Sequence, residues 1–172
     1  MILLEDLVRF AKSRGIRIGW NPGKGELTQR DKVIALLPKI DLLILNRMEA
    51  AMLLRHGYED VKAMAEKILT SGVKMVAITD GKKGAGVGSD DLWIHAGAFK
   101  TDSVDDTGAG DAFTTGLVAG VIEGKDLADS LKMGLANGAS EVTEIGAKKG
   151  LLDRREMKKW LLRKLKIVEE KF

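Results

Sequence analysis

The chain has 172 residues, a length typical of one domain with a sizeable core. Apolar residues make up 45% of it and charged residues 31%, which predicts an ordered, soluble protein. No cysteine is present, which excludes disulfides, thiol nucleophiles and cysteine-ligated zinc. The sequence shows no run of about 18 apolar residues and no secretory signal pattern, so we expect a cytoplasmic protein that does not bind membranes.

The positive charge of the chain does not indicate a nucleic-acid partner. The net charge is +3, and much of the excess lies between Arg154 and Lys171, where basic residues are interleaved with glutamates. Such interleaving is typical of a solvated helix face. The sequence has no zinc-finger pattern and only four Phe and one Tyr, so we expect no nucleic-acid binding. His56 and His95 lack further ligands at suitable spacing, so neither is expected to bind a metal.

Short β-rich runs alternate with helical patterns, which predicts an α/β fold with a mostly parallel sheet flanked by helices. The first half is expected to form a helix over 2–13, a strand over 16–20, a turn at 21–23, a helix from a cap at Thr28 to about residue 37, a strand over 41–45 and a helix over 49–56. Pro38 follows the second of these helices and should end it.

The same alternation continues in the second half. It predicts a helix over 60–71, a buried strand over 73–79, and a hairpin of strands over 84–87 and 92–95. Three helices are expected to follow, over 109–123, 127–142 and 153–168. No linker or internal repeat interrupts the pattern, so residues 1–172 are predicted to be a single domain.

The most informative segment is Asp105-Asp106-Thr107-Gly108-Ala109-Gly110-Asp111, which precedes an apolar helical pattern. A glycine-rich turn that opens a helix offers unpaired N–H groups and the positive end of the helix dipole to a phosphate. Gly108 and Gly110 would let the backbone approach the anion, and Asp111 could take a proton from an attacking hydroxyl. The alternative is an ordinary glycine-rich turn in which Asp111 is only a first-turn carboxylate.

This segment resembles the signature of the ribokinase-like (PfkB-type) carbohydrate kinases, Asp-Thr-x-Gly-Ala-Gly-Asp followed by a helix that begins with an aromatic and small residues. The resemblance implies a three-layer α/β/α sandwich of the ribokinase-like class. It implies an anion hole from Gly108 to Gly110, with Asp111 as the catalytic base. Asp105 and Thr107 then hold fixed motif positions of the nucleotide site. Asp106 departs from the usual Thr, either adding charge near the nucleotide or facing solvent.

Two earlier segments resemble nucleotide-binding elements of the same family, in the family's order. Asn46-Arg47-Met48-Glu49 is similar to the Asn-x-x-Glu element, which implies that Glu49 positions hydrated Mg²⁺ and the phosphates of ATP, with Asn46 beside them. The spacing alone also predicts a helix capping box, and the two interpretations are compatible. The segment from Thr79 to Gly84 resembles the Thr-x-Gly-x-x-Gly loop, which implies that Thr79, Gly81 and Gly84 lie against the nucleotide. The alternative is a tight turn whose glycines adopt positive φ.

Two later segments resemble the family's adenine and cation elements. By this resemblance Asn137 lies beside the adenine, and the loop over 141–147 is similar to one that holds a monovalent cation. The ligands in relatives are mostly backbone carbonyls, and those implied here belong to Asp105, Glu141, Glu144 and Gly146. Glu144 and Ile145 replace the usual basic pair, so binding of K⁺ is left open.

The resemblance covers nearly the whole chain but only the C-terminal, nucleotide-binding half of the family pattern. The N-terminal half, with its lid and sugar site, is not in this sequence. We therefore expect a fragment, a split or truncated gene product, or one partner of a two-chain enzyme. Such a half would expose a strand edge and an apolar face, which favours a homo-oligomer or association with a complementary N-terminal half.

The function that follows is ATP-dependent transfer of a phosphoryl group to a hydroxyl of a sugar or nucleoside, with Mg²⁺ bridging the phosphates. A second interpretation is a non-catalytic nucleotide-binding or assembly fragment of a split kinase. A third is a vitamin-precursor kinase of the same fold. The form of the Asp105–Asp111 motif favours the sugar kinases over the vitamin kinases.

Overall fold

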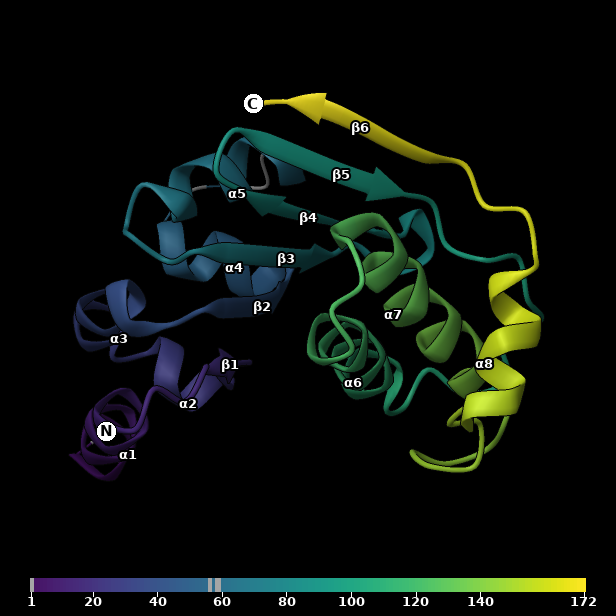
Figure 1. The fold of residues 1–172 in the computed structure, drawn as a ribbon, viewed down its shortest axis with the longest axis horizontal. Helices are drawn as coiled ribbons and strands as arrows, with labels where there is room; N and C mark the ends of the chain where they lie inside the picture. The colour runs from purple at the N-terminus through teal and green to yellow at the C-terminus, as the bar shows by residue number, and fades with distance from the viewer. Residues whose placement is uncertain (1, 56, 58–59) are drawn as a thin grey trace. The chain divides into compact units, whose positions relative to one another are not determined.

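The computed structural model describes residues 2–55, 57 and 60–172, in which helices and strands alternate (Figure 1). The elements in chain order are α1 (Ile2–Ser13), β1 (Gly19–Trp20), α2 (Lys24–Leu27), α3 (Arg30–Leu36), the 3₁₀ helix η1 (Leu37–Lys39), β2 (Leu42–Asn46), α4 (Arg47–Leu54), α5 (Val61–Leu69), β3 (Met75–Thr79), the 3₁₀ helix η2 (Gly81–Lys83), β4 (Ala85–Ser89), β5 (Leu92–Ala96), α6 (Ala109–Ile122), α7 (Leu127–Glu141), α8 (Arg154–Leu161) and β6 (Ile167–Lys171). The strands join in one sheet in the order β1-β2-β3-β4-β5-β6. This arrangement confirms the predicted α/β class.

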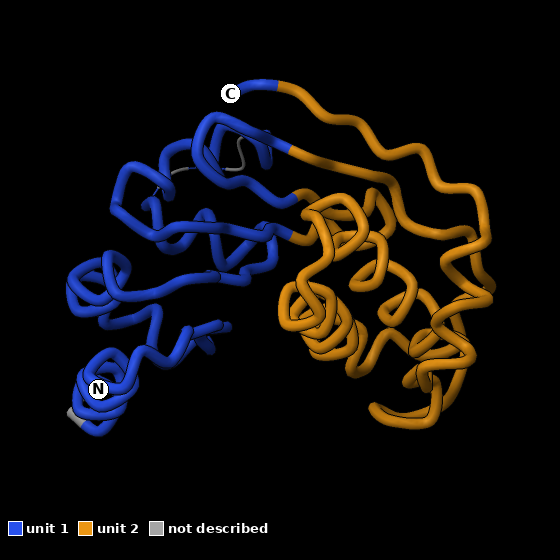
Figure 2. Tube along the Cα trace, in the orientation of Figure 1, with its two compact units in different colours: residues 1–78, 87–93, 171–172 blue, residues 79–86, 94–170 orange. Residues whose placement is uncertain are grey.

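The chain divides into two compact units (Figure 2). Unit 1 contains residues 1–78, 87–93 and 171–172, and unit 2 contains residues 79–86 and 94–170. The chain passes between the units inside β3, β4, β5 and β6 rather than through a linker. That residues 1–172 act as a single domain stays a prediction.

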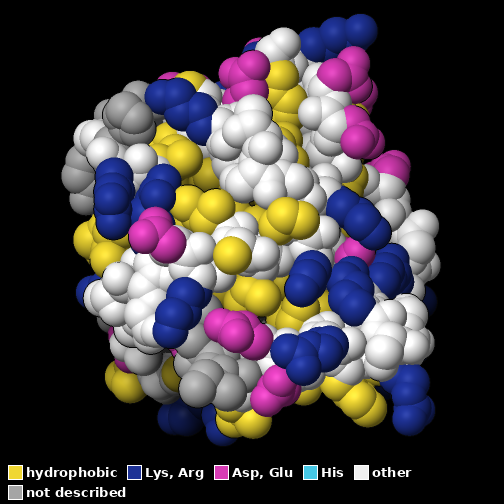
Figure 3. All heavy atoms as spheres, turned by 90° about the vertical axis from the view of Figure 1, so that its left-hand side faces the viewer, with side chains coloured by type: hydrophobic (Ala, Val, Ile, Leu, Met, Phe, Trp, Pro, Cys, Tyr) yellow, Lys and Arg dark blue, Asp and Glu magenta, His cyan; other side chains and the backbone are white. Residues whose placement is uncertain are grey.

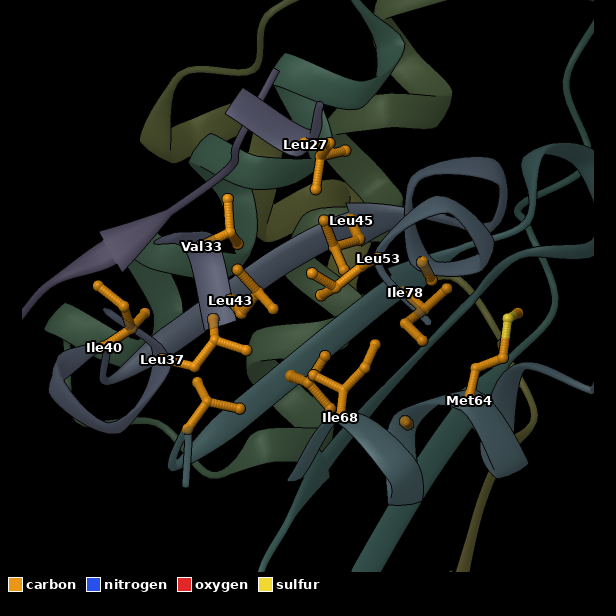
Figure 4. Packing of buried hydrophobic residues seen from close by; sticks show 14 of the residues in the cluster. Leu27, Val33, Leu37, Ile40, Leu43, Leu45, Leu53, Met64, Ile68 and Ile78 are labelled. Atoms are coloured by element: carbon orange, nitrogen blue, oxygen red, sulfur yellow. The ribbon is translucent and has the colours of Figure 1, made fainter. Parts of the chain in front are cut away.

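Unit 1 is built around the parallel pair of β1 and β2, in which Gly19 lies opposite Leu42 and Trp20 opposite Leu43. Leu42 to Leu45 are all buried, as expected for an interior parallel strand with both faces covered. Figure 4 shows side chains of β2, β3 and the surrounding helices pointing toward one another. The residues labelled there are Leu27, Val33, Leu37, Ile40, Leu43, Leu45, Leu53, Met64, Ile68 and Ile78.

A buried acid at the start of β2 ties three segments of unit 1 together. Asp41 is 5% exposed, and its carboxylate accepts hydrogen bonds from Lys12 Nζ at 2.6 Å, Lys74 Nζ at 2.7 Å and the Ile18 N–H at 2.9 Å. Burial alone would raise the pKa of Asp41, but the hydrogen bonds from Lys12, Lys74 and Ile18 lower it from 3.8 to about 2. Asp41 thus connects the end of α1 to the residues that directly precede β1 and β3.

Unit 2 is dominated by the close packing of α6 against α7. A Cβ atom on Gly116 would lie 2.5 Å from the Met133 carbonyl oxygen, and one on Gly120 would lie 2.7 Å from Ser130 Cα. Glycine is therefore required at both positions, because any side chain would push the helices apart. From α7, Gly134 lies against the ring of Phe113. The helices run antiparallel, so the end of α7 lies at the level of the start of α6.

Three sequence predictions of local structure were wrong. Thr28 does not cap a helix start: it ends α2, and its hydroxyl donates to the Gly25 carbonyl, because the chain turns helical before Thr28. The strand predicted over 16–20 is reduced to Gly19–Trp20. The helix predicted to reach residue 168 ends at Leu161, and residues 167–171 form β6 beside β5 (Figure 1). Residues 167–171 form a strand because they pair with a neighbouring strand of the sheet, and this pairing outweighs their local helical propensity.

His56, the predicted end of the helix over 49–56, lies outside the described residues, and α4 ends at Leu54. His95 lies on β5, where its Nε2 atom is 3.0 Å from Glu170 Oε1.

Over the described part of the chain, no helix is both long and apolar enough to cross a membrane.

Candidate active site

The glycine-rich turn before α6 has the geometry that a helix-start anion site needs. Gly108 is the N-cap residue, with φ of +84°, and a Cβ atom there would lie 2.9 Å from Cα and Cβ of Ala147. Both the left-handed backbone and the contact with Ala147 exclude larger residues at this position. A Cβ atom on Gly110, in contrast, would meet nothing within 4 Å. The backbone at Gly110 is therefore open to an approaching ligand.

Backbone donors at the start of α6 are unpaired. The Ala112 N–H donates to the Gly108 carbonyl at 2.8 Å, and the Ala109 N–H makes a long bond of 3.4 Å to the Asp106 carbonyl. In the described structure, no backbone hydrogen bond is formed by the N–H groups of Gly110 and Asp111. These two donors and the positive end of the α6 dipole favour an anion. The predicted anion hole thus has free donors.

Asp111 is exposed in the first turn of α6, three residues after the N-cap. Among the described residues its carboxylate has neither a hydrogen-bond partner nor an ion-pair partner. An unengaged carboxylate beside two free N–H donors could accept a proton next to a bound phosphate. Gly108, Ala109, Gly110 and Asp111 thus share one helix start, and their roles as anion hole and base stay predictions.

Asp105 organises the turn that leads into this site. One carboxylate oxygen accepts the Thr107 N–H at 2.9 Å, and the other accepts the Gly146 N–H at 3.0 Å. Hydrogen bonds from the Thr107 side chain, the Thr107 N–H and the Gly146 N–H lower the pKa of Asp105. The Val104 and Asp105 N–H groups also donate to the Val142 carbonyl, at 2.7 and 3.3 Å. The turn before α6 and the loop after α7 are thereby held side by side.

Asp106 is exposed, and its carboxylate accepts a hydrogen bond from the Ser103 hydroxyl at 2.5 Å. Both alternatives for this departure from the family motif, charge near the nucleotide or a side chain that faces solvent, stay predictions. Asp106 thus helps to shape the turn through its hydrogen bond to Ser103.

Asn137 is buried inside unit 2, with 5% of its surface exposed. Its Nδ2 donates to the Ala112 carbonyl at 2.7 Å and to Thr115 Oγ1 at 3.0 Å, and its Oδ1 accepts the Leu152 N–H at 2.9 Å. These bonds hold α6, α7 and the segment before α8 together. The amide group is thus fully engaged within the protein, and a position beside adenine stays a prediction.

The predicted cation loop contains an unexpected buried acid. Glu141 is 0% exposed, and neither of its carboxylate oxygens has a hydrogen-bond partner. Glu144 is exposed, and Gly146 has φ of +97° and donates its N–H to Asp105. Over the residues that the structure describes, no three His, Cys, Asp or Glu side chains are grouped to hold a metal ion. A cation here would depend on backbone carbonyls and few carboxylates.

The loop over 79–84 folds as the tight turn that its glycines indicate. The Asp80 N–H donates to the Gly84 carbonyl at 2.8 Å, and the Gly84 N–H donates to the Gly81 carbonyl at 3.0 Å. Gly81 has φ of +54° and Gly84 of +99°. A Cβ atom on Gly84 would lie 2.0 Å from the Ala96 carbonyl oxygen, which excludes any side chain. Contact of Thr79, Gly81 and Gly84 with a nucleotide stays a prediction.

In unit 1, Asn46 and Glu49 form the predicted capping box at the start of α4. The Asn46 N–H donates to Glu49 Oε2 at 2.8 Å, and the Glu49 N–H donates to Asn46 Oδ1 at 2.9 Å. The predicted turn at 21–23 is also tied to β2, because Asn21 Nδ2 donates to the Ile44 carbonyl. The capping role is confirmed. Their part in magnesium and phosphate binding remains predicted.

Sequence reasoning assigned Glu141 to the site only through its carbonyl and missed its buried side chain. Glu141 follows Asn137, Gly134 and Ser130 at spacings of four, three and four residues along one face of α7. That periodicity would have placed its carboxylate toward α6. The missing signal was therefore present in the spacing.

An α/β fold with free N–H donors at a glycine-rich helix start has the geometry with which many proteins hold a phosphate. The profile of the pfkB family carbohydrate kinases matches residues 4–154. This chain belongs to that family.

Similar proteins include kinases of a sugar and of a nucleoside. Ribokinase of Haemophilus influenzae is 30% identical over 162 residues, which cover 92% of this chain and 51% of that protein. Cytidine kinase of Thermococcus kodakarensis is 30% identical over 140 residues, covering 75% of this chain and 47% of that protein. This chain spans about half the length of the curated relatives it matches.

A solved structure with ATP and Mg²⁺ bound, of a candidate ribokinase II from E. coli, matches with a TM-score of 0.81 and 26% identity. It covers 92% of this chain and 52% of that protein. This similarity confirms the predicted ribokinase-like fold.

Proposed function

We propose that this chain carries the nucleotide-binding and catalytic site of an ATP-dependent kinase that phosphorylates a hydroxyl of a sugar or nucleoside. The observation that supports it most directly is the free Gly110 and Asp111 N–H groups beside the exposed Asp111 carboxylate in a pfkB-family chain. The relatives named ribokinase and cytidine kinase support the substrate class, and the ATP and Mg²⁺ bound to a similar protein support the cofactors.

In this proposal Asp111 is the base. It accepts the proton of the substrate hydroxyl as that oxygen bonds to the γ-phosphorus and the bond from phosphorus to the bridging oxygen of ADP breaks. The N–H groups of the turn stabilise the negative charge on the phosphoryl oxygens. The left-handed backbone of Gly108 forms the turn that orients these N–H groups, and the hydrogen bond from the Thr107 N–H to Asp105 stabilises this turn.

The residues present are compatible with an Mg²⁺ ion that is bound mainly by the phosphates of the nucleotide. Magnesium keeps several waters and usually binds substrate phosphates with only one or two protein carboxylates. That agrees with the lack of a three-carboxylate group in the described residues. When bound, Mg²⁺ would neutralise phosphate charge, and we propose that Glu49, with Asn46, holds it through water. Thr79, Gly81 and Gly84 are proposed to contact the nucleotide, and Asn137 to support the adenine region.

The first test is calorimetric titration with Mg²⁺ and a non-hydrolysable ATP analogue. Gly110→Val should abolish binding without unfolding the chain, because its side chain would enter the open space over the free donors. Gly25→Ala, also at an uncrowded helical glycine, is the matched control and should bind as the wild type does. Equal affinity of all three proteins, or no binding by any of them, would contradict the proposed nucleotide site.

The second test separates a kinase from a non-catalytic fragment. ADP release is measured with a panel of sugars, nucleosides and vitamin precursors, for the wild type and Asp111→Asn. A kinase should lose turnover in Asp111→Asn while its affinity for the ATP analogue changes by no more than a few fold. Binding without turnover on any acceptor would indicate an assembly fragment. Turnover only on a vitamin precursor would reassign the substrate class.

We also propose that unit 1 associates with a second copy or a complementary half. Leu3, Leu7 and Phe10 repeat at helical spacing on α1 and are 83%, 60% and 53% exposed. The two-residue strand β1 lies at an edge of the sheet. In Figure 3, hydrophobic side chains are exposed between charged ones on the face that carries α1 and α3. Sedimentation as a monomer at tens of micromolar would argue against self-association.

A further inference from the structure

Unit 2 contains a groove between α6, α7 and α8, the three helices labelled together in Figure 1. Its volume is about 780 Å³, within the range of roughly 300–1,000 Å³ that is typical of small-molecule sites. The residues that line it include none from Gly108 to Asp111 and none from the turn over 79–84. We call it the α8 groove.

The floor of the α8 groove is an apolar surface. Ala119 of α6, Met133 of α7 and Met157 of α8 line it, and the two methionines are 5% and 9% exposed. Two polar side chains, Thr115 and Asn137, also line the groove. They are already engaged, because Asn137 Nδ2 donates to Thr115 Oγ1 at 3.0 Å and both side chains donate to one backbone carbonyl of α6. A hydrocarbon group could therefore bury apolar surface there without stranding a polar group.

The rim of the α8 groove carries cations that the protein does not neutralise. Lys125, Arg154 and Lys158 line the groove and are exposed. Among the described residues, neither lysine forms an ion pair. Arg154 meets Glu123 at 3.7 Å, with 92% and 40% of the side chains exposed, which makes a weak pair. Asp153, the other acid of the groove, accepts two backbone N–H groups of α8.

The charge around α8 also favours an anion. Residues 148–166 contain nine Lys or Arg side chains and only two acids, Asp153 and Glu156. Both acids belong to the capping box at the start of α8. The glutamates that were expected to interleave with these basic residues on a helix, Glu169 and Glu170, lie on β6 instead. The surface around α8 is therefore basic rather than mixed, and its potential attracts anions.

We infer that the α8 groove binds a small amphipathic anion. The hydrocarbon part lies on the floor beside Met133 and Met157, and the anionic head group, such as a carboxylate, lies at Lys125 and Lys158. The apolar floor alone would accept any hydrocarbon, and the basic rim alone would accept any anion. Together they favour a molecule that carries both groups. This site is additional to the proposed kinase reaction and does not depend on it.

The location of the site is tested by nuclear magnetic resonance of the chain labelled in its methionine methyl groups, titrated with octanoate. The signals of Met133 and Met157 should shift together and saturate. Met48 and Met52 on α4, which are 43% and 37% exposed, control for non-specific contact with apolar surface and should not shift. Shifts of all four signals without saturation, or of none of them, would overturn the inference.

The role of the head group is tested with ligands and variants that change only the charge. Octanol and octyltrimethylammonium, used below micelle-forming concentrations, should bind more weakly than octanoate by about fivefold or more, the upper end of an exposed ion pair. Lys158→Gln should weaken octanoate binding by about twofold to fivefold. Lys159→Gln, the same change at an exposed α8 position outside the groove, is the matched control and should bind as the wild type does. Equal affinity for all three ligands would show an apolar groove without preference for anions, against the inference.

The Gly110→Val variant separates the α8 groove from the proposed nucleotide site. It should bind octanoate as the wild type does, because Gly110 does not line the groove. An ATP analogue that shifts Met133 and Met157 and displaces octanoate would place the groove in the nucleotide site and overturn the inference. Saturable binding of octanoate by a chain that does not bind the ATP analogue would support the inference while the proposed function fails.

Discussion

Replacement of Asp41 by Asn should destabilise unit 1 by an amount that depends on pH. The pKa of Asp41 lies at about 2 in the folded protein, against an ordinary value of 3.8. At about 1.36 kcal/mol for each tenfold change in proton affinity, this difference corresponds to about 2.4 kcal/mol. The side chains of Lys12 and Lys74 are 34% and 68% exposed, so solvent screening reduces the expected contribution to about 1.5 kcal/mol.

The sign follows from the lowered pKa. A carboxylate whose pKa falls on folding stabilises the folded state above its unfolded-state pKa, and that stabilisation is lost as the pH drops from about 5 toward 2. Asp41→Asn should therefore be less stable than the wild type at pH 7, and the difference should shrink to about a third near pH 2.5 and vanish below pH 2. Both stabilities are measured by urea denaturation, followed by tryptophan fluorescence and circular dichroism.

Asp31→Asn provides the matched control, because the Asp31 side chain is 84% exposed and its ion pair with Arg30 is long, at 3.4 Å. Its effect should stay within about 0.5 kcal/mol at every pH. If Asp41→Asn is as stable as the wild type at pH 7, the Asp41 network does not stabilise unit 1. A deficit of the same size at pH 7 and pH 2.5 would also refute this role, because the loss would then not come from the charge.

Three further predictions concern unit 2. Gly84→Ala should lower the melting temperature by several degrees or prevent folding, because its Cβ atom would lie 2.0 Å from the Ala96 carbonyl oxygen; a melting curve like that of Gly25→Ala would contradict the turn geometry. Asn137→Leu should cost about 2–4 kcal/mol in urea denaturation, because it removes three hydrogen bonds and leaves the buried Leu152 N–H without its partner. A loss below about 1 kcal/mol would mean that water replaces these bonds. Asp105→Asn should lower the protection of the Thr107 and Gly146 amides against hydrogen exchange, measured relative to the unfolded rate at the same pH. Because these hydrogen bonds lower the pKa of Asp105, this protection in the wild type should be lost only as the pH falls below the ordinary range of an aspartate. Unchanged protection in the variant would show that the turn does not depend on the carboxylate.

Much of the candidate site could be predicted from the sequence because it is contiguous. Seven residues from Asp105 to Asp111 contain the turn, the donors and the carboxylate, and their geometry is local to one helix start. The capping box of Asn46 and Glu49 is equally local, and its spacing alone predicted it. Helix starts obey short-range rules of backbone hydrogen bonding, so sequence reasoning is strong there.

The errors came where distant residues decide the local structure. Residues 167–171 pair as β6 because a strand partner is present, and a helical pattern cannot reveal that partner. Distant contacts also give Asn137 a role that its sequence context did not show, because its amide holds α6, α7 and Leu152 together, while its place beside adenine stays a prediction. Each of these outcomes depends on an element far along the chain.

The sequence by itself determined the α/β class, the family and the glycine-rich helix start, because hydrophobic periodicity or contiguous motif residues indicate each of them. Only the tertiary structure decided which acids are compensated. Asp41 and Glu141 are both buried acids, yet among the described residues Asp41 meets two lysines and Glu141 meets no protein donor. Burial and partners belong to the packed chain, because the cost of a charge depends on what surrounds it in space.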